Sequence, residues 1–121
     1  MTETGPDRGN AVCLICTDHR RTATFYRAAF GAVDLPGDGF GCPWLRVGGL
    51  TLTLLPNAVR PAPAPSVERA GATLLLRDAD VRAAFDRAVA AGAAVVEPPD
   101  EDATHCLVAD PDGVLIEVMT P

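Results

Sequence analysis

The sequence predicts an α+β protein of two similar halves, each with the order strand, helix and three strands. Two observations carry this prediction. An apolar strand-like segment followed by an amphipathic helical segment occurs twice in the 121 residues: Phe25 and Phe85 are 60 positions apart, and Gly31 and Gly92 are 61 apart. Each copy also ends in a segment with the turn residues of a β-hairpin. A half this small cannot bury its own sheet, so we expect the halves to pack together or against a second chain.

The first half begins with the apolar run Ala11–Thr17, which predicts a strand, and Asp18 is a suitable N-cap for a helix. Apolar side chains then recur at helical spacing as far as Gly31, which predicts the helix end. A segment rich in glycine and proline follows and predicts a turn. The next segment, Trp44–Pro56, predicts a hairpin that turns at Gly48-Gly49.

The second half repeats this order. Residues 72–78 predict a strand, and residues 78–92 predict a helix whose apolar side chains share one face. Ala93–Val96 predicts a short strand, and residues 104–120 predict a closing hairpin with its turn at Asp110–Gly113. We therefore expect a single domain, 1–121, with module one at 10–57, a proline-rich linker at 58–70 and module two at 71–120.

Composition excludes several functions. The chain has 10 Lys+Arg and 16 Asp+Glu, a net charge of −6, and every basic residue is an arginine. Chemistry that needs a lysine, such as a Schiff base, is therefore excluded. A net-acidic chain without a basic run does not favour nucleic acid as a partner. No apolar stretch is long enough to span a membrane, and the first residues do not resemble a signal peptide, so we expect a cytoplasmic protein without a membrane partner.

Cysteine and histidine suggest no obvious catalytic pair. Four cysteines are too few for a disulfide scaffold. Cys13 and Cys16 have the C-x-x-C spacing, but they lie in a predicted strand, where residues three apart point to opposite faces. His105 and Cys106 are neighbours on a predicted strand and face opposite ways, so their spacing does not supply a nucleophilic pair. His19 follows the predicted helix cap and is expected to face solvent.

The two halves resemble the vicinal oxygen chelate superfamily, which includes glyoxalase I, extradiol dioxygenases, and fosfomycin- and bleomycin-resistance proteins. The resemblance rests on TDHRRTATFYRAAFG in the first half, and on DADVRAAFDRAVAAGA and VADPDGVLIEV in the second. It implies two βαβββ modules that form a curved, mostly antiparallel sheet around a cavity, with the helices on the outer face. It also implies a homodimer.

In the same resemblance, all but one of the usual metal-ligand positions lack the histidine or carboxylate that would bind a metal. The position of the histidine in the first strand is Ala11. The corresponding histidine position of the second half falls between Gly71 and Thr73, where there is no histidine. The hairpin of the first half usually supplies a glutamate, but Trp44–Pro56 contains no carboxylate or imidazole. Glu117 alone matches a metal-ligand position. One carboxylate does not hold a divalent ion firmly. We therefore expect no metal cofactor, although a divalent metal held unconventionally by Glu117 with Cys106 or Cys13 stays open.

Pairing arithmetic selects the candidate ligand-binding residues. If Val47 pairs with Leu50, then Arg46 lies opposite Thr51 and Trp44 lies opposite Thr53. These four side chains share one face of the hairpin. The other face is apolar and is expected to cover the helices; it carries Leu45, Val47, Leu50 and Leu52. A four-residue turn in the second hairpin pairs Ala109 with Val114 and hence Cys106 with Glu117. Alternation in the remaining strands adds the other positions. The expected ligand-binding set is Trp44, Arg46, Thr51, Thr53, Thr73, Arg77, Cys106 and Cys13, with Glu117 as the catalytic candidate.

Several of these residues have alternative roles. Trp44 is either a stacking wall for a ring-bearing ligand or a filler of the core or of a dimer interface. Arg46 and Arg77 either clamp an anionic group or pair with Glu117 or another acid. Glu117 either transfers protons in a dry cavity or stays ionised beside an arginine as a structural strut.

The leading hypothesis is metal-free binding of a small molecule, resembling the bleomycin-resistance branch that sequesters a drug or natural product. The alternative is an enzyme of the glyoxalase, dioxygenase or epimerase type, with Glu117 as metal ligand or acid/base. A third hypothesis is a regulatory subunit whose cavity has lost its ligand.

Overall fold

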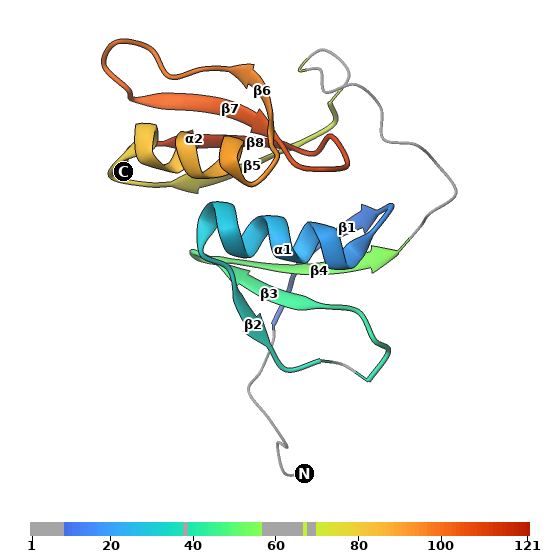
Figure 1. Cartoon of the computed structure of the whole chain (residues 1–121). Helices are drawn as coiled ribbons and strands as arrows, with labels where there is room; N and C mark the ends of the chain where they lie inside the picture. Colours follow the sequence, from blue (N-terminus) through green and yellow to red (C-terminus); the bar gives the residue numbers. More distant parts are fainter. Residues whose placement is uncertain (1–8, 38, 57–66, 68–69) are drawn as a thin grey trace.

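The computed structural model describes residues 9–37, 39–56, 67 and 70–121. In these described ranges ten helices and strands follow one another in two sets of five, as the repeat predicts (Figure 1). Module one contains β1 (Val12–Cys16), α1 (His19–Phe30), β2 (Val33–Leu35), β3 (Trp44–Val47) and β4 (Leu50–Pro56). Module two contains β5 (Thr73–Arg77), α2 (Val81–Ala90), β6 (Ala94–Glu97), β7 (His105–Ala109) and β8 (Leu115–Met119). Most of the linker expected at 58–70 lies outside the described residues.

The two modules have the same sheet topology. The four strands of sheet one have the order β1-β4-β3-β2, and those of sheet two the order β5-β8-β7-β6. In each sheet the first strand of the module, β1 or β5, lies at an edge and is parallel to its neighbour, and the other pairs are antiparallel. Neither sheet closes into a barrel. The predicted fold class, α+β with two βαβββ modules, is confirmed.

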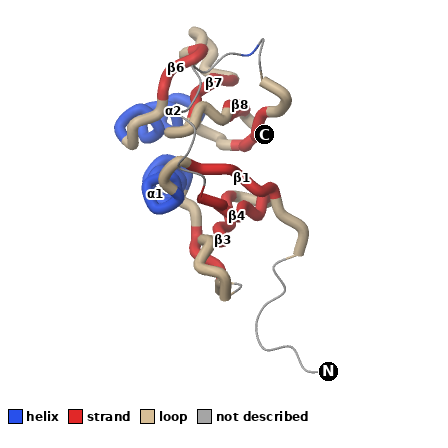
Figure 2. Tube along the Cα trace, turned by 90° about the vertical axis from the view of Figure 1, so that its right-hand side faces the viewer, coloured by secondary structure: helices blue, strands red, loops and turns tan. Residues whose placement is uncertain are grey.

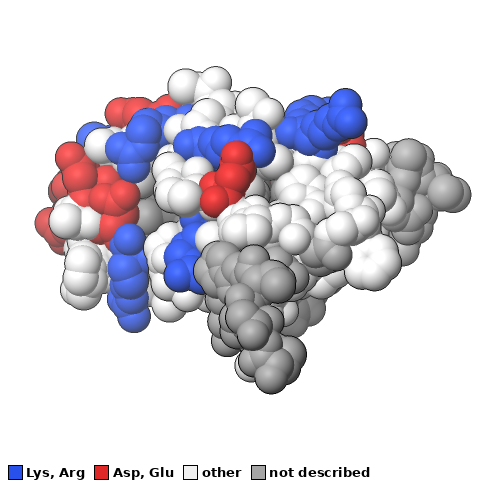
Figure 3. Space-filling model, turned by 90° about the horizontal axis from the view of Figure 1, so that it is seen from below, with Lys and Arg blue, Asp and Glu red and all other residues white. Residues whose placement is uncertain are grey.

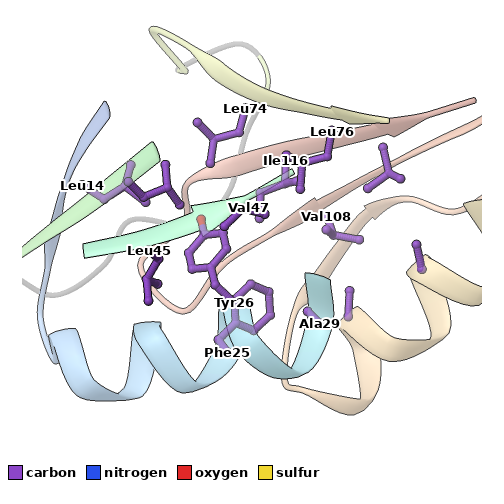
Figure 4. Close-up of a cluster of buried hydrophobic side chains, with 14 of the residues drawn as sticks. Leu14, Phe25, Tyr26, Ala29, Leu45, Val47, Leu74, Leu76, Val108 and Ile116 are labelled. Carbon is purple, nitrogen blue, oxygen red and sulfur yellow. The ribbon is translucent and has the colours of Figure 1, made fainter. Parts of the chain in front are cut away.

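Both helices lie on the same side of the molecule, and the strands of the two sheets lie on the other (Figure 2). Side chains from both sheets and both helices form one continuous core between these layers. Phe25 and Tyr26 project from α1 into this core, toward Val47 of module one and Ile116 of module two (Figure 4). The modules therefore bury their apolar faces against each other, as expected for halves too small to fold alone.

Local sequence signals set both ends of α1. The side chain of Asp18 accepts the backbone N–H groups of Arg20 and Arg21, both at 3.1 Å. Gly31 ends the helix in the left-handed conformation, with φ of 66°, which a glycine adopts without strain. Both predicted boundaries are confirmed.

The start of α2 differs from the position that the repeat suggested. Asp78 matches Asp18 in the offset, but the helix is capped by Asp80, whose side chain accepts the N–H of Ala83 at 3.0 Å. Asp78 instead accepts the N–H of Asp80 at 2.9 Å and so shapes the turn before the helix.

The repeat predicts three strands after each helix, but in module one the sequence pattern located only the two strands of the hairpin, and β2 is the third. Its three residues pair antiparallel with β3, with Val33 opposite Arg46 and Leu35 opposite Trp44. Three residues do not show an alternation pattern. These residues form a strand because the backbone of β3 supplies their hydrogen-bonding partners.

The hairpin of β3 and β4 has the predicted register: Val47 lies opposite Leu50 and Trp44 opposite Thr53. The hairpin of β7 and β8 does not, because Ala109 lies opposite Leu115 rather than Val114. The Asp110 side chain accepts the N–H groups of Asp112 and Val114, at 2.9 and 3.0 Å, and the backbone N–H of Asp110 donates to the Val114 carbonyl at 3.0 Å. Asp110 and Val114 thus close the turn, which shifts every later pair by one residue.

No helix in the described part of the chain is both long and apolar enough to cross a membrane.

Candidate functional site

The face of sheet one that points away from the helices, here called open face one, carries most of the predicted ligand-binding residues. Across the strands, Trp44 lies opposite Thr53, and Thr53 opposite Cys13. In the adjacent row, Arg46 lies opposite Thr51. The structure therefore brings these residues of module one onto one surface, as the hairpin arithmetic predicts. Between them, the alternate residues of β3 and β4 are buried in the core: Leu45, Val47, Leu52 and Leu54.

Open face two, the corresponding face of sheet two, carries Glu117. This residue lies between Leu75 of β5 and Leu107 of β7. Thr73 and Arg77, two residues before and after Leu75, share its face because side chains alternate along a strand. Across the described residues Glu117 makes no ion pair: Arg46 lies on the other sheet, and Arg77 donates from Nη1 to the carbonyl of Thr120 at 3.0 Å. The pairing of Glu117 with an arginine, considered from the sequence, does not occur among the residues that the structure describes.

Cys106 does not lie beside Glu117, and the prediction of this pair is wrong. The shifted register places Cys106 opposite Val118, on the helix side of the sheet, where it is 0% exposed. Leu107 occupies the position opposite Glu117 instead. Burial raises the pKa of the Cys106 thiol, and it raises the pKa of Cys16 to about 11, so both stay protonated at neutral pH. Cys13 is exposed and is the cysteine that remains on an open face.

The sequence reasoning missed a polar pair on open face two. His105 Nε2 lies 3.3 Å from the Glu97 carboxylate, and its Nδ1 lies 3.5 Å from the Thr104 hydroxyl. A bulge in β6 brings this about: Glu97 lies opposite Leu107, where a regular ladder would place Val96. Strand alternation from Glu117 could have placed His105 on this face once the register was known, but the bulge leaves no clear signal in the sequence.

The edges of β1 and β5 meet at a cleft of about 420 Å³. Cys13 and Thr73, predicted on separate strands, both line it, together with residues of the turn between β7 and β8. A second cleft, of about 440 Å³, lies between the turn of β3 and β4 and the end of β5, and Arg77 lines it. The predicted site residues are thus spread over two open faces and two clefts.

On the face shown in Figure 3, charged side chains of both signs are interspersed. Viewed from below, arginine side chains alternate with acidic ones over part of the surface, and another part carries neither (Figure 3). This distribution does not match a phosphate backbone.

A family model of glyoxalase-like domains matches residues 11–119. Among solved structures, FosX from Listeria monocytogenes, a genomically encoded fosfomycin resistance protein, is 18% identical with a TM-score of 0.69, over 99% of this chain and 93% of that one. A hypothetical protein from S. aureus is 19% identical, with a TM-score of 0.73 over 93% and 96% of the two chains. A gene product from Arabidopsis thaliana is 26% identical, with a TM-score of 0.66 over 98% of each chain. No curated protein matches the sequence.

The paired βαβββ modules and these similarities define the class, the vicinal oxygen chelate superfamily. The chain belongs to its glyoxalase-like domain family. This superfamily implies a divalent metal, which needs at least three donor side chains close together. In the ranges that the structure describes, no three His, Cys, Asp or Glu side chains come together in a group able to hold a metal ion. The described residues therefore do not fit this metal.

Proposed function

We propose that this protein binds a small organic molecule on open face one and does so without a metal, as in sequestration of a drug or natural product. The observation that carries the proposal is the row of Trp44, Thr53 and Cys13, with Arg46 and Thr51 beside it. An indole flanked by hydroxyl groups and a guanidinium can stack on a ring and bind its polar substituents.

A second aromatic side chain lies close to Trp44 in the sequence. Phe40 lies in the connection between β2 and β3, four residues before Trp44, and is 85% exposed. The glycines on both sides of it have positive φ angles, 89° at Gly39 and 82° at Gly41. In this proposal the exposed Phe40 ring also contacts the ligand.

Arg46 supports a ligand with an anionic group. It is exposed, and in the described part of the chain it has no carboxylate partner. A guanidinium can take a carboxylate or phosphate through two parallel hydrogen bonds.

The single tryptophan of the sequence is the reporter for the test. A panel of aromatic and peptide-derived natural products is titrated while Trp44 emission and the melting temperature are measured. We expect at least one compound to change the emission saturably and raise the melting temperature. Arg46→Gln should weaken an anionic hit at least tenfold. Arg82→Gln, the same change on the surface of α2, should not. A panel without any hit, together with detected catalytic turnover, would overturn the proposal.

The second candidate is acid–base catalysis by Glu117 on open face two. It is favoured by the position of this carboxylate between Leu75 and Leu107, with no arginine partner in the described ranges, and by the His105–Glu97 pair on the same face. A partly apolar surrounding suits proton transfer at a bound carbonyl compound. Glu117→Gln should then abolish any turnover found in a carbonyl-substrate screen, whereas Asp86→Asn on α2 should not. Activity unchanged in Glu117→Gln would remove this candidate.

A further inference from the structure

The cleft beside Arg77 lies where the two modules meet. It is formed by the last residue of α1, the turn between β3 and β4, and the second half of β5. Its walls are mainly apolar, with Phe30, Leu50, Leu76 and Val118 among them. A volume of about 440 Å³ lies within the range of small-molecule sites in proteins.

Two charged residues line this cleft, and only one of them has its charge compensated. The Asp78 carboxylate accepts from Arg87 Nη2 at 3.2 Å and from the N–H of Asp80 at 2.9 Å. Arg77 donates from Nη1 to a backbone carbonyl, that of Thr120, and is in no ion pair among the described residues. Its guanidinium has five N–H donors, so most stay available. Among the described residues, the uncompensated charge at this cleft is therefore the positive charge of Arg77.

The turn between β3 and β4 leaves its side of the cleft open. Gly48 and Gly49 line the cleft without side chains, and a Cβ added at either would meet no atom within 4 Å. Gly48 has a φ of +57°, so a side chain there would be strained, whereas Gly49 has no such restriction. A large side chain at position 49 can thus be placed at the mouth of the cleft without straining the backbone.

We propose that this cleft is a second small-molecule site, separate from open face one, that takes small apolar carboxylates. The carboxylate binds the free N–H groups of Arg77, and the hydrocarbon part packs against Phe30, Leu50 and Val118. Charge-assisted hydrogen bonds to a guanidinium select the acid over a neutral molecule of the same shape.

The probe is 4-phenylbutyrate, compared with 4-phenylbutan-1-ol and 4-phenylbutylamine. Each is titrated into the ¹⁵N-labelled full chain, and amide shifts are followed by NMR. We expect saturable shifts at residues 47–50 and 75–78, and affinity for the acid at least tenfold above that for the alcohol or the amine. No saturable shifts at these amides, or equal affinity for the three probes, would overturn the proposal.

Three variants locate the binding. Arg77→Gln should reduce the affinity for the acid to that for the alcohol. Arg82→Gln should leave it unchanged, since Arg82 also donates to a backbone carbonyl, that of Asp100 at 3.3 Å, but lies on α2 outside the cleft. Gly49→Phe should weaken both acid and alcohol by covering the cleft. Preserved amide spectra establish that each variant is folded.

Trp44→Phe separates this site from the proposed function. Binding of 4-phenylbutyrate in the cleft should survive this change, because Trp44 does not line it. If binding is lost in Trp44→Phe but kept in Arg77→Gln, the acid binds at open face one and the cleft proposal is wrong. Failure of the natural-product panel, in contrast, does not affect the cleft.

Discussion

Asp110 carries a buried carboxyl group that joins the two modules. It is 4% exposed, and its Oδ2 accepts the Tyr26 hydroxyl of α1 at 2.9 Å. Burial raises the pKa of Asp110, although hydrogen bonds from Val114, Tyr26 and Asp112 act against this shift. Burial and the nearby Asp110 charge also raise the pKa of Tyr26 well above its ordinary value, so the hydroxyl remains a donor. The contact therefore consists of a neutral phenol bound to a poorly hydrated carboxyl group.

Tyr26→Phe should destabilise the protein by about 1–3 kcal/mol, because it leaves one oxygen of a buried carboxyl group without its donor. Urea unfolding measures the change. The same substitution in an Asp110→Asn background should be less destabilising, because the remaining oxygen belongs to a neutral group. Equal losses in both backgrounds would mean that the hydroxyl and the carboxyl group are not coupled.

Asp110 also predicts a pH dependence. Its pKa in the folded chain lies above the ordinary 3.8, so the folded state binds this proton more tightly than the unfolded state. Its favourable contribution is complete below pH 3.8 and is lost as the pH rises through the folded-state pKa. The stability of the natural chain relative to Asp110→Asn should therefore increase when the pH is lowered from 7 to 4, as measured by urea unfolding of both proteins. An increase on raising the pH would show that the hydrogen bonds outweigh burial.

Asp112 makes a second contact between the modules. Its Oδ1 accepts both the backbone N–H and the hydroxyl of Thr17, at 2.9 and 2.7 Å, and its Oδ2 accepts the hydroxyl of Thr22 at 3.2 Å. The turn of module two thus fixes the position at which α1 follows β1. The DPDG segment, on which the family resemblance partly rests, therefore connects the two modules through the side chain of Asp112.

At the scale of elements, the two hairpins show why one register could be predicted and the other could not. In the first hairpin, the adjacent glycines Gly48 and Gly49 favour a two-residue turn, so Val47 pairs with Leu50 as predicted. In the second, the Asp110 side chain binds two backbone N–H groups of its own turn and makes Asp110 and Val114 the closing pair. One side chain thereby changes which residue lies opposite Glu117.

The glycine turn can be tested by two neighbouring substitutions. Gly48→Ala should destabilise the protein by about 1 kcal/mol, because alanine must adopt a positive φ there. Gly49→Ala should have a smaller effect or a slight stabilising one, since its φ is not restricted to glycine. Thermal unfolding of the two variants provides the comparison. Equal losses at both positions would contradict the assigned turn geometry.

At the scale of the whole molecule, we propose that two copies of the chain associate through sheet one. β1 is an edge strand, and its Ile15 lies opposite Leu55 of β4. These two side chains are 54% and 38% exposed, and by alternation from Cys13 and Thr53 they lie on open face one, where they form an apolar pair that a second copy can cover. The homodimer implied by the superfamily resemblance would cover this surface.

Ile15→Glu should convert a dimer to a monomer, because a charge would have to be buried at the contact. Light scattering after size exclusion measures the mass of both proteins. Val95→Glu, which places the same charge at an exposed position of β6, should not change the mass. A natural chain that is already monomeric at high concentration would exclude this dimer.

The sequence by itself determined the two-module fold, the ends of α1, and the face that Trp44, Arg46, Thr51 and Thr53 share. These features depend on local rules: side-chain alternation, capping and a two-glycine turn act over a few residues. Tertiary structure decided the pairing of Glu117 with Leu107, the burial of Cys106, the His105–Glu97 pair and the two clefts. The register of the second hairpin follows from a side chain that binds N–H groups two and four residues further along its own turn, which the turn residues alone do not indicate. The bulge and the packing of one module on the other depend on contacts between segments far apart in the chain. No pattern within a single segment specifies such contacts.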